Sequence, residues 1–169
     1  MLELFGHEIE RGLGIDLSRD MLALARTRLD RAGLREPLRA FAAERPVLGT
    51  CAGLILLASR LDEASAGHGV VPLGLLDCEV RRNGYGRQID SFQADIALHG
   101  VDAGAAPFPG VFIRAPRLGS LGPDVEVLAT HGDEPVGVRQ GRVIGLAFHP
   151  ELTADGRLHA AFARLAGAL

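Results

Sequence analysis

The first third of the chain carries apolar residues at the spacing of an amphipathic helix. Within residues 21–43, leucine occupies positions 22, 24, 29, 34 and 38, and arginine and glutamate fill many of the places between them. Gly33 interrupts this pattern and Pro37 can restart it, so two helical pieces are expected. The Arg45-Pro46 pair then ends the second piece.

A short apolar run at residues 47–50 predicts a buried strand, and the apolar run at 52–60 predicts a helix directly after it. Beyond Gly67 the pattern changes to short runs rich in β-formers, separated by Gly, Pro and Asp. The expected strands are 70–80, 88–98, 111–114, 125–129, 136–139 and 143–148, and residues 158–169 are expected to form a closing helix. Early and late helices around many strands predict an α/β three-layer domain.

Composition narrows the class of protein further. The 169 residues are 47% hydrophobic and 23% charged, which fits one globular domain over residues 1–169. Lys+Arg 18 against Asp+Glu 21 gives a net charge of −3 without long like-charge runs, so no nucleic-acid partner is expected. Two cysteines make no disulfide framework, the apolar run at 54–58 is too short for a bilayer, and the acidic N-terminus does not match a signal peptide. We therefore expect a cytoplasmic protein with no membrane partner.

The sharpest local feature is Gly49-Thr50-Cys51-Ala52-Gly53, a G-x-C-x-G turn between the predicted strand and helix. This is the nucleophile-elbow pattern with cysteine in place of serine. The helix N-terminus favours a thiolate at Cys51, and the backbone N–H of Ala52 could donate to an oxyanion. The alternative is a small buried cysteine in an ordinary strand-to-helix turn.

A thiol nucleophile needs a base and a group that orients the base. Four of the six histidines have no obvious partner in the sequence: His7, His68, His99 and His159. A fifth, His131, lies in the segment THGDE, which is expected to be a solvated turn. His149 instead follows the apolar run 143–148, precedes Pro150 and has Glu151 two residues later. Alone it could be a satisfied histidine at a strand end, but with Cys51 it favours a Cys–His–Glu triad.

Four segments in order carry a resemblance to a known family: GTCAGLILLA at 49–58, RNGYGRQIDSF at 82–92, VFIRAP at 111–116 and FHPELT at 148–153. They resemble the glutaminase subunit of pyridoxal 5′-phosphate synthase, a class I, triad-type glutamine amidotransferase. The resemblance covers residues 33–169 almost throughout. It implies a flavodoxin-like α/β three-layer fold and, for a partner, the synthase subunit. It also implies that ammonia from L-glutamine passes to vitamin B6 synthesis and, since the partner makes the cofactor, that this chain holds none. No metal is expected either, because no cluster of His, Asp and Glu in the sequence has the spacing of metal ligands.

The resemblance also implies roles for individual residues. Cys51 matches the nucleophile, and His149 with Glu151 completes the triad. Arg82, Ile113 and Arg114 match residues that hold glutamine, and an arginine can pair with the substrate carboxylate. The alternatives are a surface charge at Arg82 and a partner contact at Arg114. Cys78 matches no functional position and is expected to be a core thiol of a strand.

The chain departs from the family at its front. Family members open with an apolar strand bearing an Ala-Leu-Gln-Gly type motif, and a later Gly-Gly-Glu-Ser loop supplies an oxyanion donor and part of the glutamine pocket. Residues 1–20 contain no such loop and no strong β run, and at most residues 21–27 resemble the helix after it. Three explanations are open: a truncated or shifted reading frame, a degenerate protein, or a replacement of the loop by these residues.

Three functions compete at this point. The first is a glutamine amidotransferase that supplies ammonia to a synthase. The second is a relic or docking-only subunit, which the absent loop favours. The third is a cysteine-dependent hydrolase or chaperone-like protein on the same scaffold, against which the Arg82 and VFIRAP motifs argue.

Overall fold

A mixed seven-stranded sheet forms the centre of the protein in this computed structural model, which describes residues 13–16, 33–66, 70–85, 91–101 and 106–167. The strand order is β1-β2-β10-β9-β8-β5-β6, with β1–β2 and β2–β10 parallel and the other pairs antiparallel. Its strands are β1 (Leu13–Asp16), β2 (Val47–Thr50), β5 (Ser91–Leu98), β6 (Phe108–Ile113), β8 (Glu126–His131), β9 (Glu134–Gln140) and β10 (Val143–Leu146).

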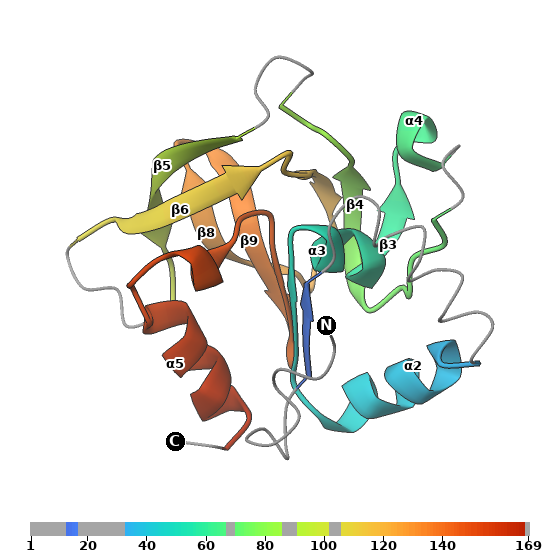
Figure 1. The fold of residues 1–169 in the computed structure, drawn as a ribbon. Helices are drawn as coiled ribbons and strands as arrows, with labels where there is room; N and C mark the ends of the chain where they lie inside the picture. Colours follow the sequence, from blue (N-terminus) through green and yellow to red (C-terminus); the bar gives the residue numbers. More distant parts are fainter. Residues whose placement is uncertain (1–12, 17–32, 67–69, 86–90, 102–105, 168–169) are drawn as a thin grey trace.

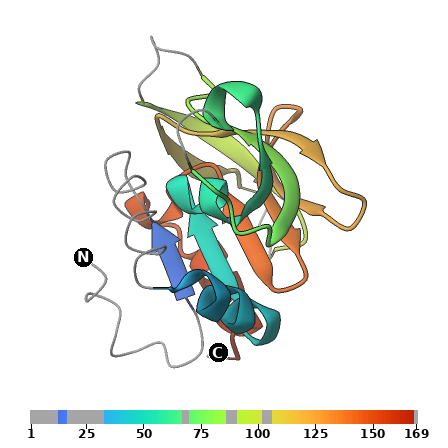
Figure 2. The same ribbon diagram turned by 90° about the vertical axis from the view of Figure 1, so that its right-hand side faces the viewer.

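A second sheet and the helices surround this centre. The smaller sheet has the order β3-β4-β7, from β3 (Ala58–Leu61), β4 (Leu76–Arg81) and β7 (Arg117–Leu121). The helices are α2 (Arg35–Glu44), α3 (Ala52–Leu57), α4 (Glu63–Ala66), the 3₁₀ turn η1 (Pro150–Leu152) and α5 (Arg157–Leu165). In Figure 1 the parallel strands are seen nearly edge-on, with α5 on one side and α2 and α3 on the other. The view in Figure 2, with α2 in front, shows the same layering.

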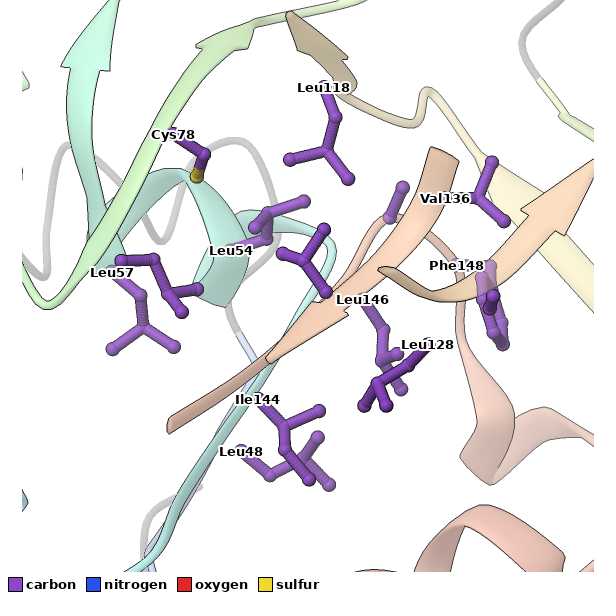
Figure 3. Close-up of a cluster of buried hydrophobic side chains, with 14 of the residues drawn as sticks. Leu48, Leu54, Leu57, Cys78, Leu118, Leu128, Val136, Ile144, Leu146 and Phe148 are labelled. Atoms are coloured by element: carbon purple, nitrogen blue, oxygen red, sulfur yellow. The ribbon is translucent and has the colours of Figure 1, made fainter. Parts of the chain in front are cut away.

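The core lies between α3 and the middle of the large sheet. All four residues of β2 and of β10 are buried, as expected for strands covered on both faces. Leu54 and Leu57 of α3 point into the same apolar cluster as Leu146 and Cys78 (Figure 3). A Cβ at Gly49 would lie 2.8 Å from the backbone carbon of Gly53, so the glycine allows α3 to begin directly above the strand.

Several predicted elements are confirmed. The strand at 47–50 is present, and the helical piece after Gly33 is α2, with Pro37 in its first turn. Strands also cover most of the runs expected at 111–114, 125–129, 136–139 and 143–148, with bounds shifted by a few residues. The closing helix is α5, which ends at Leu165. Residues 21–32 and 88–90, where a further helical piece and the start of a strand were expected, lie outside the described residues.

Other expectations were wrong. The helix expected at 52–60 ends at Leu57, because Ala58–Leu61 forms β3 and pairs with β4. Residues 70–75 are irregular rather than strand, and β7 was not expected because its sequence, RLGSL, has little β pattern. Within residues 1–20, where no β run was expected, Leu13–Asp16 forms β1. Its parallel pairing satisfies the backbone groups along the edge of β2 that would otherwise be exposed.

Candidate active site

Cys51 lies at the turn between β2 and α3, in a conformation that non-glycine residues rarely adopt. Its φ is 49° and its ψ is −103°, so the backbone reverses sharply at the cysteine. The Cys51 N–H donates to the carbonyl of Leu146 over 2.7 Å, which joins the turn to the end of β10. The Sγ lies 3.7 Å from the carbonyl oxygen of Ile113, and the residue is half-buried. This is the strained strand-to-helix geometry predicted from the G-x-C-x-G pattern.

His149 and Glu151 approach Cys51 from the chain after β10. Since β2 and β10 are parallel, their carboxyl ends lie at the same end of the sheet, where the turn after β2 and the chain after β10 meet (Figure 1). The His149 N–H donates to the carbonyl of Val111 over 2.8 Å, and Pro150 begins the 3₁₀ turn η1. The Nδ1 of His149 lies 2.6 Å from the Oε1 of Glu151, and the imidazole also forms a hydrogen bond with the Cys51 side chain. The structure thus brings the three residues of the predicted triad into one hydrogen-bonded chain.

The surroundings of His149 favour the protonated form of its imidazole. Burial lowers the pKa of His149, but hydrogen bonds and charge interactions with Cys51 and Glu151 outweigh it and raise the pKa to about 10. Burial raises the pKa of Glu151, but the hydrogen bond with His149 outweighs it and holds the pKa below its usual range. The pair is therefore suited to an imidazolium that holds a proton beside the Cys51 side chain, with Glu151 ionised as its partner.

The raised pKa of His149 predicts a pH-dependent contribution to stability. The folded state keeps a proton that the unfolded state releases above about pH 6.5, so the contribution is complete below that pH and is lost as the pH rises through about 10. We expect the difference in unfolding free energy between the wild type and His149→Gln to shrink over this window, measured by urea denaturation near pH 6, about pH 8 and about pH 10. A matched His99→Gln variant, at an exposed histidine, is the control for the substitution itself. A difference for His149→Gln that stays constant with pH would contradict the assignment.

Ala52, the residue predicted to donate to an oxyanion, is the first residue of α3. Ala52 is buried and begins the helix directly after Cys51. Its N–H is among the first four of the helix, which have no carbonyl of the same helix to bond. This N–H therefore has no helical bond to make, and it belongs to the residue directly after Cys51. Residues 1–20, whose sequence contains no Gly-Gly-Glu-Ser loop to supply a second donor, are outside the described residues except for 13–16.

The three predicted glutamine-binding residues lie on two neighbouring segments. Ile113 ends β6, and its carbonyl contacts Cys51. Arg114 follows it with a φ of 45°, which turns the chain away from the strand at an exposed position. Arg82 follows β4 in the turn formed by residues 82–85, and its N–H donates to the Ser65 hydroxyl. The structure therefore places Ile113 against Cys51, and Arg82 and Arg114 on adjacent turns. The roles of these residues stay predictions.

Sequence reasoning missed a polar group next to these turns. Tyr85 of the Arg82 turn and Arg117 of β7 both donate to the carboxylate of Glu134, at the start of β9. Tyr85 belongs to the RNGYGRQ motif, and Glu134 lies in the THGDE segment that was expected to be a solvated turn. His131 of that segment is in fact the last residue of β8, half-buried, with its ring 6.2 Å from that of Phe112. No pattern in the sequence pairs these residues, because they come from three distant segments.

Two further features bear on the chemistry. Cys78 is completely buried on β4, as expected for a core thiol, and burial raises its pKa to about 11. Among the described residues, no three of His, Cys, Asp and Glu lie together in a way that could hold a metal ion. In the same part of the chain, no helix has the length and apolar content needed to cross a bilayer.

Comparison with protein families gives a match over most of the chain. Residues 21–166 match the model of the SNO glutamine amidotransferase family. The chain belongs to this family. The matched range includes the turn at Cys51 and the pair formed by His149 and Glu151. The family expected from the four sequence segments is thereby confirmed.

Curated relatives are about half identical to the chain. The pyridoxal 5′-phosphate synthase subunit PdxT of Mycolicibacterium vanbaalenii is 53% identical over 132 residues, which are 77% of this chain and 66% of the relative. The protein of the same name from Acidothermus cellulolyticus is 54% identical over 142 residues, covering 80% of this chain and 67% of the relative. The protein of that name from Thermococcus onnurineus is 54% identical over 140 residues, which are 82% of this chain and 68% of the relative. The chain thus spans about two thirds of the length of these relatives.

Solved structures confirm the fold class. A crystal structure of a glutamine amidotransferase superposes with a TM-score of 0.76 at 41% identity, covering 92% of this chain and 79% of the other. A glutamine amidotransferase from Thermotoga maritima has a TM-score of 0.51 at 19% identity over 90% of this chain and 60% of its own, which shows a shared fold alone. The chain has the α/β fold of a class I glutamine amidotransferase.

Proposed function

We propose that this chain is an amidotransferase domain that hydrolyses the side-chain amide of L-glutamine and delivers the ammonia to a synthase subunit for pyridoxal 5′-phosphate synthesis. The observation that carries the proposal is the hydrogen-bonded chain from Cys51 through His149 to Glu151. Family membership supports the reaction type, and the name shared by the relatives supports the product.

We assign each member of the proposed triad one part of the reaction. The Cys51 thiolate attacks the amide carbon of glutamine, and the tetrahedral oxyanion accepts a hydrogen bond from the Ala52 N–H. His149 then gives its proton to the leaving nitrogen, the C–N bond breaks and ammonia departs. A water molecule, deprotonated by His149, attacks the glutamyl thioester, and the C–S bond breaks to release glutamate and restore the thiolate. Glu151 accepts from Nδ1 throughout, which leaves Nε2 as the nitrogen for the proton transfers.

Substrate binding is proposed at the two turns beside the nucleophile. Arg82 and Arg114 would pair with the carboxylate of glutamine, and Ile113 would contact the substrate next to the sulfur. Such residues orient the amide carbon toward Cys51, which is as important to the rate as the nucleophile itself. The chemistry proposed needs no metal or cofactor from this chain.

The synthase partner is proposed from the relatives, which are named as subunits of pyridoxal 5′-phosphate synthase. The assembly would be a hetero-oligomer in the cytoplasm, without nucleic acid or membrane. Ammonia released at Cys51 is lost to solvent unless an acceptor site is near. A docked synthase would provide that site and so allow the ammonia to be used.

The test is ammonia release from L-glutamine by the chain, with and without the synthase, and with Cys51→Ala as the blank. Turnover that depends on Cys51 and rises with the synthase is the expected result. If the folded chain binds the synthase but releases no ammonia, the alternative of a docking-only role replaces the enzyme. If ammonia release survives in Cys51→Ala, the proposed nucleophile is wrong.

Replacement of Arg82 tests the substrate site. We expect Arg82→Ala to raise the KM for glutamine by about 10- to 100-fold, because a charge-assisted hydrogen bond to the substrate carboxylate is lost. The neighbouring variant Arg81→Ala is a matched control, since Arg81 is an exposed arginine that pairs with Asp62 over 3.3 Å. In steady-state kinetics, Arg81→Ala should have the same KM for glutamine as the wild type. An unchanged KM for Arg82→Ala as well would assign Arg82 to the surface instead of the site.

A further inference from the structure

The carboxylate of Glu134 joins two segments that are distant in sequence. Arg117 donates to it through Nε and Nη2, at 2.7 Å to Oε1 and 2.7 Å to Oε2. The Tyr85 hydroxyl donates to the same Oε1 over 2.9 Å. The Glu134 side chain is 20% exposed and that of Arg117 is 43% exposed, so the group is partly shielded from water. Bidentate arginine–carboxylate pairs of this kind fix geometry as well as supplying energy.

The two joined segments are the ones proposed to hold glutamine. Tyr85 ends the turn that Arg82 begins, and Arg117 lies three residues after Arg114. The Gly84 N–H also donates to the Ala115 carbonyl over 3.1 Å, which ties the same two segments through their backbones. A side chain at Gly84 would collide with Arg117, so the glycine is what allows the turn to lie against the arginine.

Aromatic packing connects the group to β6 as well. The Tyr85 ring meets Phe92 at 5.2 Å and Phe112 at 5.9 Å between centroids, in both cases edge to face. Phe112 precedes Ile113 on β6 and is fully buried. The guanidinium of Arg117 lies 5.1 Å from the centroid of the Tyr85 ring, so the two residues that bind Glu134 also form a cation–π contact with each other. Tyr85 therefore contacts both β6, which carries Ile113, and Arg117, which lies three residues after Arg114.

We propose that Glu134 is a positioning residue for glutamine binding, which holds the Arg82 turn and the segment after Ile113 at a fixed separation through Tyr85 and Arg117. This inference rests on the proposed function. Residues 82–85 and 114–116 lie between strands rather than within them, so the side-chain bonds to Glu134 add to the backbone bond between Gly84 and Ala115 where no strand ladder fixes the chain. Glu134 itself acts through these partners and not on the substrate. Its loss leaves the Cys51–His149–Glu151 chain unchanged and loosens only the substrate site.

The experiment compares Glu134→Gln and Tyr85→Phe with the wild type, as full-length chains in complex with the synthase. The first variant keeps the shape of the side chain and removes the charge, and the second removes the hydroxyl and keeps the ring. We expect Glu134→Gln to raise the KM for glutamine about tenfold and Tyr85→Phe about threefold, with kcat within about twofold of wild type. Glu126→Gln is the matched control, because Glu126 forms a comparable but exposed ion pair with Arg139 on the same hairpin at 2.7 Å. Its KM should not change.

A second readout separates binding from turnover. Iodoacetamide alkylates Cys51, and bound glutamine should protect it, with the modified peptide quantified by mass spectrometry. Glu134→Gln should alkylate at the wild-type rate without glutamine but need about tenfold more glutamine for half-protection. Equal half-protection in Glu134→Gln and wild type, or a fall in kcat alone, would overturn the positioning role while leaving the proposed function standing. If glutamine neither protects nor turns over in the wild type, the proposed function fails and this inference fails with it.

Discussion

Replacement of Cys51 by alanine is expected to reduce ammonia release from glutamine by roughly 10⁴-fold or more. The sulfur forms the covalent bond to the amide carbon, so no other group in the triad can take its place. The fold should remain, because Cys51 is half-buried at a turn and the backbone bond to Leu146 does not involve its side chain. The measurement is the rate of ammonia release by the complex with the synthase, together with the melting temperature.

Cys78→Ala is the matched control for this variant. Cys78 is the other cysteine of the chain, but it is buried on β4 and its pKa is raised to about 11, so it is not a thiolate near neutral pH. We expect Cys78→Ala to keep the wild-type rate and to lose some stability through the small cavity that it leaves. If the two variants lost activity equally, the losses would come from damaged folding and not from the missing nucleophile.

Replacement of His149 by alanine is expected to lower kcat by about 10³- to 10⁴-fold, nearly as much as loss of the nucleophile. Without the imidazole, Cys51 loses its hydrogen-bond partner and the group that would take up its proton, and the departing ammonia loses its proton donor. The alkylation rate of Cys51 by iodoacetamide near neutral pH should fall along with kcat, which links the loss to the thiol itself.

His99→Ala is the control for the loss of a histidine. His99 is exposed and its Nε2 lies 3.1 Å from the Thr130 hydroxyl, away from the triad. It should leave kcat and the alkylation rate unchanged. Wild-type alkylation of Cys51 in His149→Ala would show that the imidazole does not activate the thiol, and would leave the hydrogen bond to Glu151 without a catalytic purpose.

Local sequence was sufficient for the nucleophile turn and its partners. Gly49, Cys51 and Gly53 predicted the turn because the G-x-C-x-G pattern is typical of a tight strand-to-helix bend, and a Cβ at Gly49 would lie 2.8 Å from the backbone carbon of Gly53. His149 and Glu151 were predicted because Pro150 ends the preceding extended run and turns the chain at a definite residue. These are short-range effects, which the sequence states directly.

Elements fixed by pairing were not predictable in the same way. The run 52–60 is apolar enough for one helix, yet it divides at Leu57 because Ala58 and the residues after it find a partner in β4. β1 and β7 have weak patterns of their own, and each forms beside a strand whose edge groups need partners. In all three cases a neighbouring strand outweighs the local propensity.

The sequence by itself determined the family, the α/β class and the candidate triad, because each depends on residues that are adjacent or on motifs in a fixed order. Only the tertiary structure decided that Tyr85, Arg117 and Glu134 meet beside the turn that Arg82 begins. Those three residues come from a turn, an edge strand and a hairpin. Arginine and glutamate occur throughout the chain, so the sequence does not show which of them pair. Their contact follows from the way the two sheets bring these segments together, which no local pattern of residues records.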